Sequence, residues 1–447
     1  MVEEISKIKD AIIEVLQEKG PGFSTKQLDP SVKEALKQFE FPDTKSEAWR
    51  KTNLNSVLKH HYVSAKLTDV PDEFINTFSF YGIDTERIVF VNGFFSEKHS
   101  KLSDSKDKII VGSMKKEAKK HPELFETYFT SSAGNGQNIF TALNTAFAHD
   151  GAFILIKEGY NSEKPIHIIN YINGENQKIF AQSRNLIVVQ KKANAKIINT
   201  FHSLTSDFTF NNVVTEIVVE ENASTEYYLF EGEGNSASHL GQVFVNQHQN
   251  SRFKSNIQTL CGIFVRNEYT VNLLGENCET DLKGLYLPDR EQHFDNYINV
   301  NHYSPNCRST QLFKGIIDDS AQAVYSGKVY VARDAQKTDS SQSNKNILLT
   351  DKSRAFSRPQ LEIYADDVAC SHGSTVGQME KEALFYLRSR GISENNAKTI
   401  LLSAFINELQ EDISIKPYRD YVTYLTEKRL KGQKVEGLCF VKVCPSC

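Results

Sequence analysis

A turn residue recurs about every 28 residues through the middle of this chain. The corners are KANAK (Asn194), EENAS (Asn222), HQNSR (Asn250), GENCE (Asn277), SPNCR (Asn306) and ARDAQ (Asp334), spaced by 28, 28, 27, 29 and 28 residues. Each turn residue precedes Ala, Ser or Cys. Asn and Asp tolerate the left-handed backbone conformation and therefore mark tight turns. A fixed period of this size is typical of stacked supersecondary units.

The segments between these corners have the character of strands. Runs such as AFILI, NLIVV, TEIVVE and GKVYVA are rich in β-branched residues, and long helical periodicity is missing. Strands joined by asparagine corners predict a β-solenoid, in which each coil covers the edge of the next. The fold class is therefore mainly β. We expect the core at residues 139–370, with roughly eight coils of about 28 residues.

Helical patterns flank this core. Residues 1–132 predict an α-rich N-terminal domain, and the small polar stretch TSSAGNGQN follows as a boundary. Residues 371–430 predict a C-terminal helical domain, in which Gly391 occupies a C-cap position and Ser393 can cap the next helix. Residues 431–447 form a cysteine-bearing tail.

The composition excludes several classes of protein. A net charge of −4 argues against a general basic face for nucleic acid, and no run approaches 18 apolar residues, so no membrane helix is expected. The N-terminus does not have the pattern of a signal peptide. Seven cysteines, an odd number in a long chain, argue against a disulfide framework. These features indicate a protein of the reducing cytoplasm.

Local catalytic motifs are missing from the sequence. The chain has no GxxxxGK[ST], so we expect no nucleotide site of its own, and it has no GxSxG or HExxH. Two acidic pairs, Asp318-Asp319 and Asp366-Asp367, could bind calcium or cleave carbohydrate, although exposed turn acids are the commoner meaning. No local pattern indicates a catalytic triad of Ser, His and Asp.

Cys370 and His372, in ADDVACSHGSTVGQ, are the strongest chemical candidates. Residues two apart in a strand point to one face, so a thiolate and an imidazole could converge on one ion. Both ligand types suit iron and zinc. Two ligands cannot close a tetrahedral site, so the others must come from elsewhere in the fold, from another chain or from sulfide. The alternative is a buried thiol beside a hydrogen-bonded histidine.

Other candidates have simpler readings. Cys439, Cys444 and Cys447 form a C-x4-C-x2-C pattern that could hold zinc or a cluster but lacks a fourth ligand, so incidental thiols are the alternative. Trp49, the only tryptophan, is expected to be a packing anchor. His302 is expected to be a hydrogen-bonded histidine of a coil rather than a ligand.

Several stretches together resemble the SufB/SufD family, the scaffold subunits of the SUF iron–sulfur cluster assembly machinery. The strongest is ADDVACSHGSTVGQ followed by EALFYLRSRGI, and SEAWRKT, VNGFFS, LNTAFAHDG and HYSPNCRSTQLFKGI also fit. The resemblance covers most of residues 40–412. The SufB-like signature reads C-E-H where this chain has C-S-H, so the chain is similar to the SufD branch. The cysteines of the tail depart from the family pattern.

The resemblance implies a right-handed parallel β-helix between N-terminal and C-terminal helical domains. It implies a non-catalytic scaffold that pairs side by side with a SufB-type scaffold, binds a SufC-type ATPase and can form a homodimer when alone. A transient iron–sulfur cluster is then expected at the SufB interface, with His372 opposite a cysteine of the partner and Cys370 beside it. The candidates for the ATPase-facing helix are Leu384, Phe385, Tyr386, Leu387 and Arg390, although several of these could pack inward.

Three other interpretations remain open from the sequence. A carbohydrate-active β-helix enzyme would need paired acids in a cleft and usually a secretion signal. A purely structural solenoid would hold no iron or sulfide. The chain could also be the SufB-like subunit, with the two paralogues exchanged.

Overall fold

Two ten-stranded sheets dominate the computed structural model, which describes residues 2–17, 30–72, 83–103, 107–134 and 137–433. Strands make up 43% of the chain and helices 23%. The first sheet contains β1 (Val63–Ser64), β4 (Ile109–Ser113), β5 (Ala152–Ile156), β7 (Ile179–Val189), β9 (Thr209–Val219), β11 (Ala237–Gln247), β13 (Phe264–Leu273), β15 (His293–His302), β17 (Gln322–Val331) and β19 (Arg354–Ile363). The second contains β2 (Glu86–Val91), β3 (Phe94–Phe95), β6 (Ile166–Ile172), β8 (Asn194–Ser203), β10 (Ser224–Gly232), β12 (Arg252–Cys261), β14 (Glu279–Tyr286), β16 (Arg308–Ile317), β18 (Thr338–Leu348) and β20 (Val368–Gln378).

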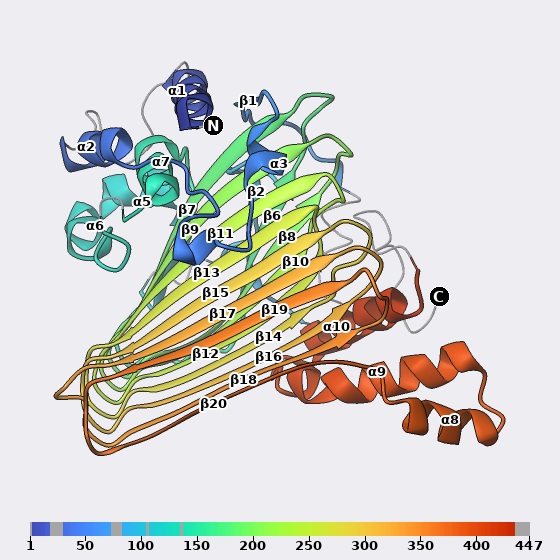
Figure 1. The fold of residues 1–447 in the computed structure, drawn as a ribbon. Coiled ribbons are helices and arrows are strands. Elements are labelled where there is room, and N and C mark those ends of the chain that lie inside the picture. Colours follow the sequence, from blue (N-terminus) through green and yellow to red (C-terminus); the bar gives the residue numbers. More distant parts are fainter. Residues whose placement is uncertain (1, 18–29, 73–82, 104–106, 135–136, 434–447) are drawn as a thin grey trace.

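The chain alternates between the two sheets, so that from β5 onward each strand pairs in parallel with the strand two places later. The result is a parallel β-solenoid of about eight turns, which confirms the predicted architecture. In Figure 1 the coils stack from the green strands near the N-terminal helices to the orange strands β19 and β20. The strands extend beyond the predicted core, since β2 and β4 join the sheets at one end and β20 runs to Gln378.

The four central asparagines of the predicted repeat lie at the sharp corners of their coils. Asn222, Asn250, Asn277 and Asn306 have left-handed φ angles of 57, 57, 58 and 60°. The residue after each is small and almost fully buried, as in Ala223 and Cys278. A side-chain ladder adds to this corner, because the Asn250 amide donates to Asn222 over 3.1 Å. The corner therefore needs a residue that tolerates positive φ followed by one that fits inside.

The prediction was wrong for the two outer corners. Asn194 is the first residue of β8, and the left-handed residue of that coil is Lys192 (φ 59°). Asp334 does not adopt positive φ, and Lys337 (φ 61°) takes the corner instead. The buried residues that follow, Ala193 and Thr338, keep the pattern. A search for asparagine or aspartate missed these corners because lysine occupies the left-handed position there.

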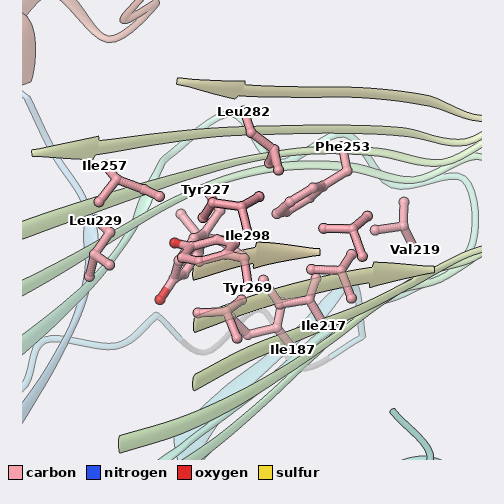
Figure 2. Close-up of a cluster of buried hydrophobic side chains, with 14 of the residues drawn as sticks. Ile187, Ile217, Val219, Tyr227, Leu229, Phe253, Ile257, Tyr269, Leu282 and Ile298 are labelled. Carbon is pink, nitrogen blue, oxygen red and sulfur yellow. The ribbon is translucent and has the colours of Figure 1, made fainter. Parts of the chain in front are cut away.

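The space between the two sheets is filled by stacked side chains. Figure 2 shows Tyr227, Leu229 and Phe253 of the second sheet pointing toward Ile217 and Tyr269 of the first. All five are at most 3% exposed. Because each coil repeats the inward positions of the preceding one, the buried side chains form columns along the stack.

Helices of the N-terminal region lie against the outside of the first sheet. They are α1 (Val2–Gln17), α2 (Pro30–Gln38), a 3-10 turn (Glu47–Trp49), α3 (Asn55–Leu58), α5 (Met114–Lys120), α6 (Pro122–Tyr128) and α7 (Ile139–Phe147). Trp49 and Phe140 belong to a buried cluster that includes Phe180, Phe210 and Phe264 of the strands. This confirms Trp49 as a packing anchor.

Three helices follow the last strand: α8 (Lys381–Ser389), α9 (Glu394–Glu411) and α10 (Lys416–Leu430). Gly391 ends α8 with φ 84°, as its C-cap position predicted. Asp412, between α9 and α10, accepts ion pairs from Lys254 and Lys283 at 2.9 and 2.5 Å. These contacts, with the buried tyrosine Tyr418 of α10, hold the helices against the second sheet. No helix in the described ranges is long and apolar enough to span a membrane.

Candidate functional site at the open end of the solenoid

The last coil of the solenoid consists of β19 and β20. Each is the terminal strand of its sheet and pairs on one side only, with β17 and β18 respectively, in the described part of the chain. An uncovered edge of this kind presents backbone donors and acceptors to another strand. The orange strands β19 and β20 mark this end in Figure 1.

The exposure of inward-facing side chains changes abruptly at this coil. Val329 and Val331 are fully buried in β17. Their partners in β19 are Leu361, which is half-buried, and Ile363, which is 37% exposed. Tyr364 lies in an outer row, with its ring centre 5.6 Å from that of Tyr330. Leu361 and Ile363 lack the covering layer that the inward side chains of the preceding coil have, so a further layer of protein would bury them favourably.

Cys370 and His372 lie in β20 on the face that continues the interior of the solenoid. Cys370 pairs in register with Ser340, and His372 pairs with Gln342. Both partners are buried, at 1% and 3% exposure, whereas Cys370 is half-buried and His372 is exposed. The two candidate ligands therefore share one face, as predicted, roughly 7 Å apart along the strand. Both side chains lie on the inward face of the terminal strand, where a protein layer added to this end of the solenoid would cover them.

A chain of polar side chains runs through the interior below Cys370. Nε2 of His302 lies 2.9 Å from the Ser309 hydroxyl, which lies 2.8 Å from the Ser340 hydroxyl. Burial lowers the pKa of His302 to about 4, so this histidine is neutral at pH 7. His302 is thus hydrogen-bonded inside a coil, in agreement with its predicted role.

The Cys370 thiol is less acidic than a free cysteine. Burial raises its pKa, and the negative charge of Asp339 raises it further, while a backbone hydrogen bond with Ser340 opposes both. The thiolate is the form that binds metals, so an additional cation at this site would favour ligation. Among the described residues no group of three or more His, Cys, Asp or Glu side chains is arranged to hold a metal ion. Cys370 and His372 are thus at most part of a ligand set.

The predicted partner-binding residues of α8 divide into two groups. Leu384 and Leu387 are half-buried, and Leu384 lines a cavity of about 750 Å³ together with residues of α9 and the end of β18. Phe385 and Tyr386 are 74% and 58% exposed, and Arg390 stacks against Tyr386 with its guanidinium carbon 5.2 Å from the ring centre. No residue of α8 is fully buried. The outer face of α8 is therefore aromatic and exposed.

The acidic pairs take part in turns. The Asp319 carboxylate accepts a hydrogen bond from the backbone of Arg290 over 3.0 Å, and Asp319 itself has φ 50°. Asp367 forms an ion pair with Lys337 at 2.6 Å. These contacts support the reading of both pairs as turn acids. Cys439, Cys444 and Cys447 lie outside the described residues.

Comparison with known families agrees with this architecture. Residues 170–405, more than half of the chain, match the family described as SUF system FeS cluster assembly, SufBD core domain, and residues 24–168 match the SufBD protein N-terminal region. The chain belongs to the SufBD family. The function that this establishes is iron–sulfur cluster assembly.

Individual SufBD relatives align over most of the chain. An iron-sulfur cluster assembly SufBD family protein of Synechocystis is 29% identical over 388 residues, which is 85% of each chain. The iron-sulfur cluster assembly protein SufD of Escherichia coli is 28% identical, covering 90% of this chain and 93% of its own. SufD of Bacillus subtilis is 25% identical over 94% of this chain and 99% of its own. The resemblance to the SufD branch is thereby supported.

Some residues of the site were not identified from the sequence. Ser309, Ser340 and Gln342 lie in the interior columns that lead to Cys370 and His372. One signal was available, because the column of Gln342 holds Leu282 two coils earlier, whereas the two coils after Leu282 place glutamine there. Reading that signal requires the strand register, which the asparagine corners define only approximately.

Proposed function

We propose that this chain is a non-catalytic scaffold subunit for iron–sulfur cluster assembly that pairs with a SufB-type scaffold through the open end of its solenoid. The observation that carries the proposal is the uncovered last coil, in which Ile363 and Val376 are 37% and 45% exposed and which also carries Cys370 and His372. A second solenoid with a similar open end would cover these side chains and pair with the free edges of β19 and β20.

The nascent cluster would form where the two scaffolds meet. His372 and Cys370 offer one imidazole and one thiol, which suit iron but leave coordination positions open. A partner's cysteine or inorganic sulfide would supply the remaining ligands. In this arrangement the cluster is cargo, assembled only when both halves of the site are present, and the chain carries no resident metal centre.

An ATPase of the SufC type would bind the outer face of α8. Phe385 and Tyr386 are large exposed aromatic side chains, and Arg390 adds a cation next to them. Aromatic and arginine side chains are the residues most enriched at the centres of protein interfaces. Because α9 and α10 are tied to the second sheet through Asp412, motion of the ATPase could be transmitted to the solenoid.

Coexpression with a SufB-type scaffold and a SufC-type ATPase tests the cluster site. We expect His372→Ala to leave the complex intact while its iron and acid-labile sulfide content falls severalfold. His61→Ala, which changes another exposed histidine far from β20 in sequence, serves as the matched control and should retain both. Unchanged iron and sulfide in the His372 variant would remove this residue from the site.

Separate variants test the two docking surfaces. Ile363→Asp should abolish scaffold pairing, because a charge would be buried at the interface, while ATPase binding persists. Phe385→Ala with Tyr386→Ala should weaken ATPase binding by about tenfold or more while scaffold pairing persists. Size-exclusion chromatography and calorimetric titration distinguish the two effects. Pairing that survives Ile363→Asp would place the scaffold interface elsewhere.

A further inference from the structure

A basic hollow lies at the open end of the solenoid, apart from the two candidate ligands. It has a volume of about 460 Å³ and is lined by Arg50, Lys51, Ala355, Phe356, Ser357, Arg358, Ser374 and Val376. Three of these side chains are cationic and none is acidic. Ser374 follows His372 by two residues on the same face of β20, so the hollow adjoins the site described above.

The segment that carries Arg50 and Lys51 is held firmly in place. Trp49 is buried, with the guanidinium carbon of Arg266 3.8 Å from its ring centre. The Thr52 hydroxyl donates a hydrogen bond to buried Asp295. Residues on both sides of Arg50 and Lys51 are thus anchored against the first sheet, and the two cationic side chains between them are exposed. The anchored SEAWRKT motif therefore holds the positive charges of Arg50 and Lys51 in a fixed position beside the hollow.

The side chains of the hollow have unused capacity for an anion. The Lys51 ammonium lies 4.6 Å from the centre of the Phe356 ring, and Arg358 bonds the Glu47 carboxylate at 3.0 Å. Among the described residues, neither Arg50 nor Lys51 has a carboxylate within 4 Å. Ser374, on the inward face of β20, is exposed at the rim of the hollow, so its hydroxyl is free to donate to a bound acceptor.

We propose that this hollow is a binding site for a phosphate-bearing small molecule. Guanidinium groups bind phosphate through paired, charge-assisted hydrogen bonds, and lysine adds a point charge. The Ser374 hydroxyl donates to a remaining oxygen, and the Phe356 ring offers an apolar wall for the rest of the ligand. A volume of about 460 Å³ falls within the range of small-molecule sites, roughly 300 to 1,000 Å³. The site uses residues of this chain alone, but Val376 and the edge of β19 also belong to the surface proposed for pairing, so the ligand and a second scaffold would compete for this end of the solenoid.

The single tryptophan provides the measurement, because Trp49 precedes Arg50 directly. Inorganic pyrophosphate and inorganic phosphate are titrated into the full chain at low ionic strength while tryptophan emission is recorded. We expect a saturable change for pyrophosphate, with an affinity that falls as sodium chloride is added. The double variant Arg50→Ala with Lys51→Ala should bind about tenfold more weakly or worse.

Control variants separate a specific site from general charge. Lys37→Ala with Lys119→Ala removes two exposed positive charges elsewhere and should leave the affinity unchanged. Ser374→Ala should weaken binding by about fivefold without removing a charge, so it tests the site even where the double variant fails to fold. A linear, non-saturating response, or equal weakening by both double variants, would overturn the site. Scaffold pairing measured on the same proteins reports separately on the proposed function.

Discussion

The guanidinium carbon of Arg266 lies 3.8 Å from the centre of the Trp49 ring, and Arg266 also forms ion pairs with Glu268 and Asp295. Arg266 is fully buried, so the tryptophan and the two carboxylates compensate a charge that is removed from water. This contact joins the N-terminal segment to the outside of the first sheet.

Trp49→Ala should therefore destabilise the protein by about 3–5 kcal/mol, because it leaves a cavity and removes the face on which Arg266 stacks. Urea denaturation followed by circular dichroism measures the change. Phe385→Ala, which truncates an exposed aromatic side chain of α8, is the control and should shift stability by no more than about 0.5 kcal/mol. A similar shift in both variants would contradict the anchoring role of Trp49.

The architecture was predictable because the corner of the solenoid has a strong local requirement. A left-handed residue followed by a small buried one recurs at six successive corners from Lys192 to Lys337, and asparagine meets the first condition at Asn222, Asn250, Asn277 and Asn306. The register failed at Lys192 and Lys337, since a lysine corner has no distinctive pattern in the sequence. The exposure of side chains in the last coil could not be predicted, because it depends on which strands end the two sheets and therefore lack a neighbour on one side.

The corner requirement can be tested at Asn250, whose φ is 57°. Its side chain also links two coils, donating to Asn222 over 3.1 Å and accepting from Asn277 over 3.0 Å. Asn250→Gly retains the backbone conformation and removes only the side-chain hydrogen bonds to the neighbouring coils, so it should lower the free energy of unfolding by about 0.5–1.5 kcal/mol. Asn250→Val adds backbone strain of roughly 1–2 kcal/mol. Denaturant midpoints give the difference between the two variants.

The same substitution within a strand is the matched control for Asn250→Val. Asn246 lies in β11 with extended backbone, and its amide oxygen accepts from Asn272 over 2.9 Å. Asn246→Val loses a comparable hydrogen bond without positive-φ strain, and valine suits a strand. If it destabilises the protein as much as Asn250→Val does, the left-handed corner carries no special cost.

Cys370 should react slowly with iodoacetamide at pH 8, because its raised pKa keeps most of the thiol protonated. Since Asp339 contributes to that rise, Asp339→Asn should lower the pKa and accelerate alkylation by about twofold or more. Peptide mass spectrometry resolves Cys370 from the other cysteines. Asp351→Asn, which removes another exposed carboxylate, should leave the rate unchanged, and an unaltered rate in the Asp339 variant would exclude its electrostatic influence.

The candidate site was predictable in its residue types but not in its surroundings. Cys370 and His372 share a face because they are two apart in a strand, which spacing alone predicts. The hydrogen-bonded row of His302, Ser309 and Ser340 beneath them joins three strands far apart in the sequence. Such contacts depend on which residues of neighbouring coils pair in register, and local sequence patterns do not reveal this pairing.

His239 gives the interior a pH dependence of its own. It lies fully inside the solenoid, with Nδ1 2.7 Å from a Glu233 oxygen and Nε2 3.5 Å from a Glu231 oxygen. Burial lowers the pKa of His239, but the charges of Glu233 and Glu231 outweigh burial and the net pKa is raised above 6.5. A raised histidine pKa contributes stability that is complete below the unfolded value and is lost as pH rises through the folded value.

Buried histidines with lowered pKa, such as His302, still bind protons in the unfolded state near pH 6.5 and therefore make stability rise with pH there. The fall in melting temperature that His239 causes should therefore dominate only above about pH 7.5, where unfolded imidazoles are largely neutral. His239→Gln should flatten the profile in this range, whereas His61→Gln, at an exposed position, should preserve it. Melting curves recorded by circular dichroism across the range give the slope. A slope that is unchanged in the His239 variant would mean that this imidazole stays neutral between its two glutamates, and that a glutamate carries the proton instead.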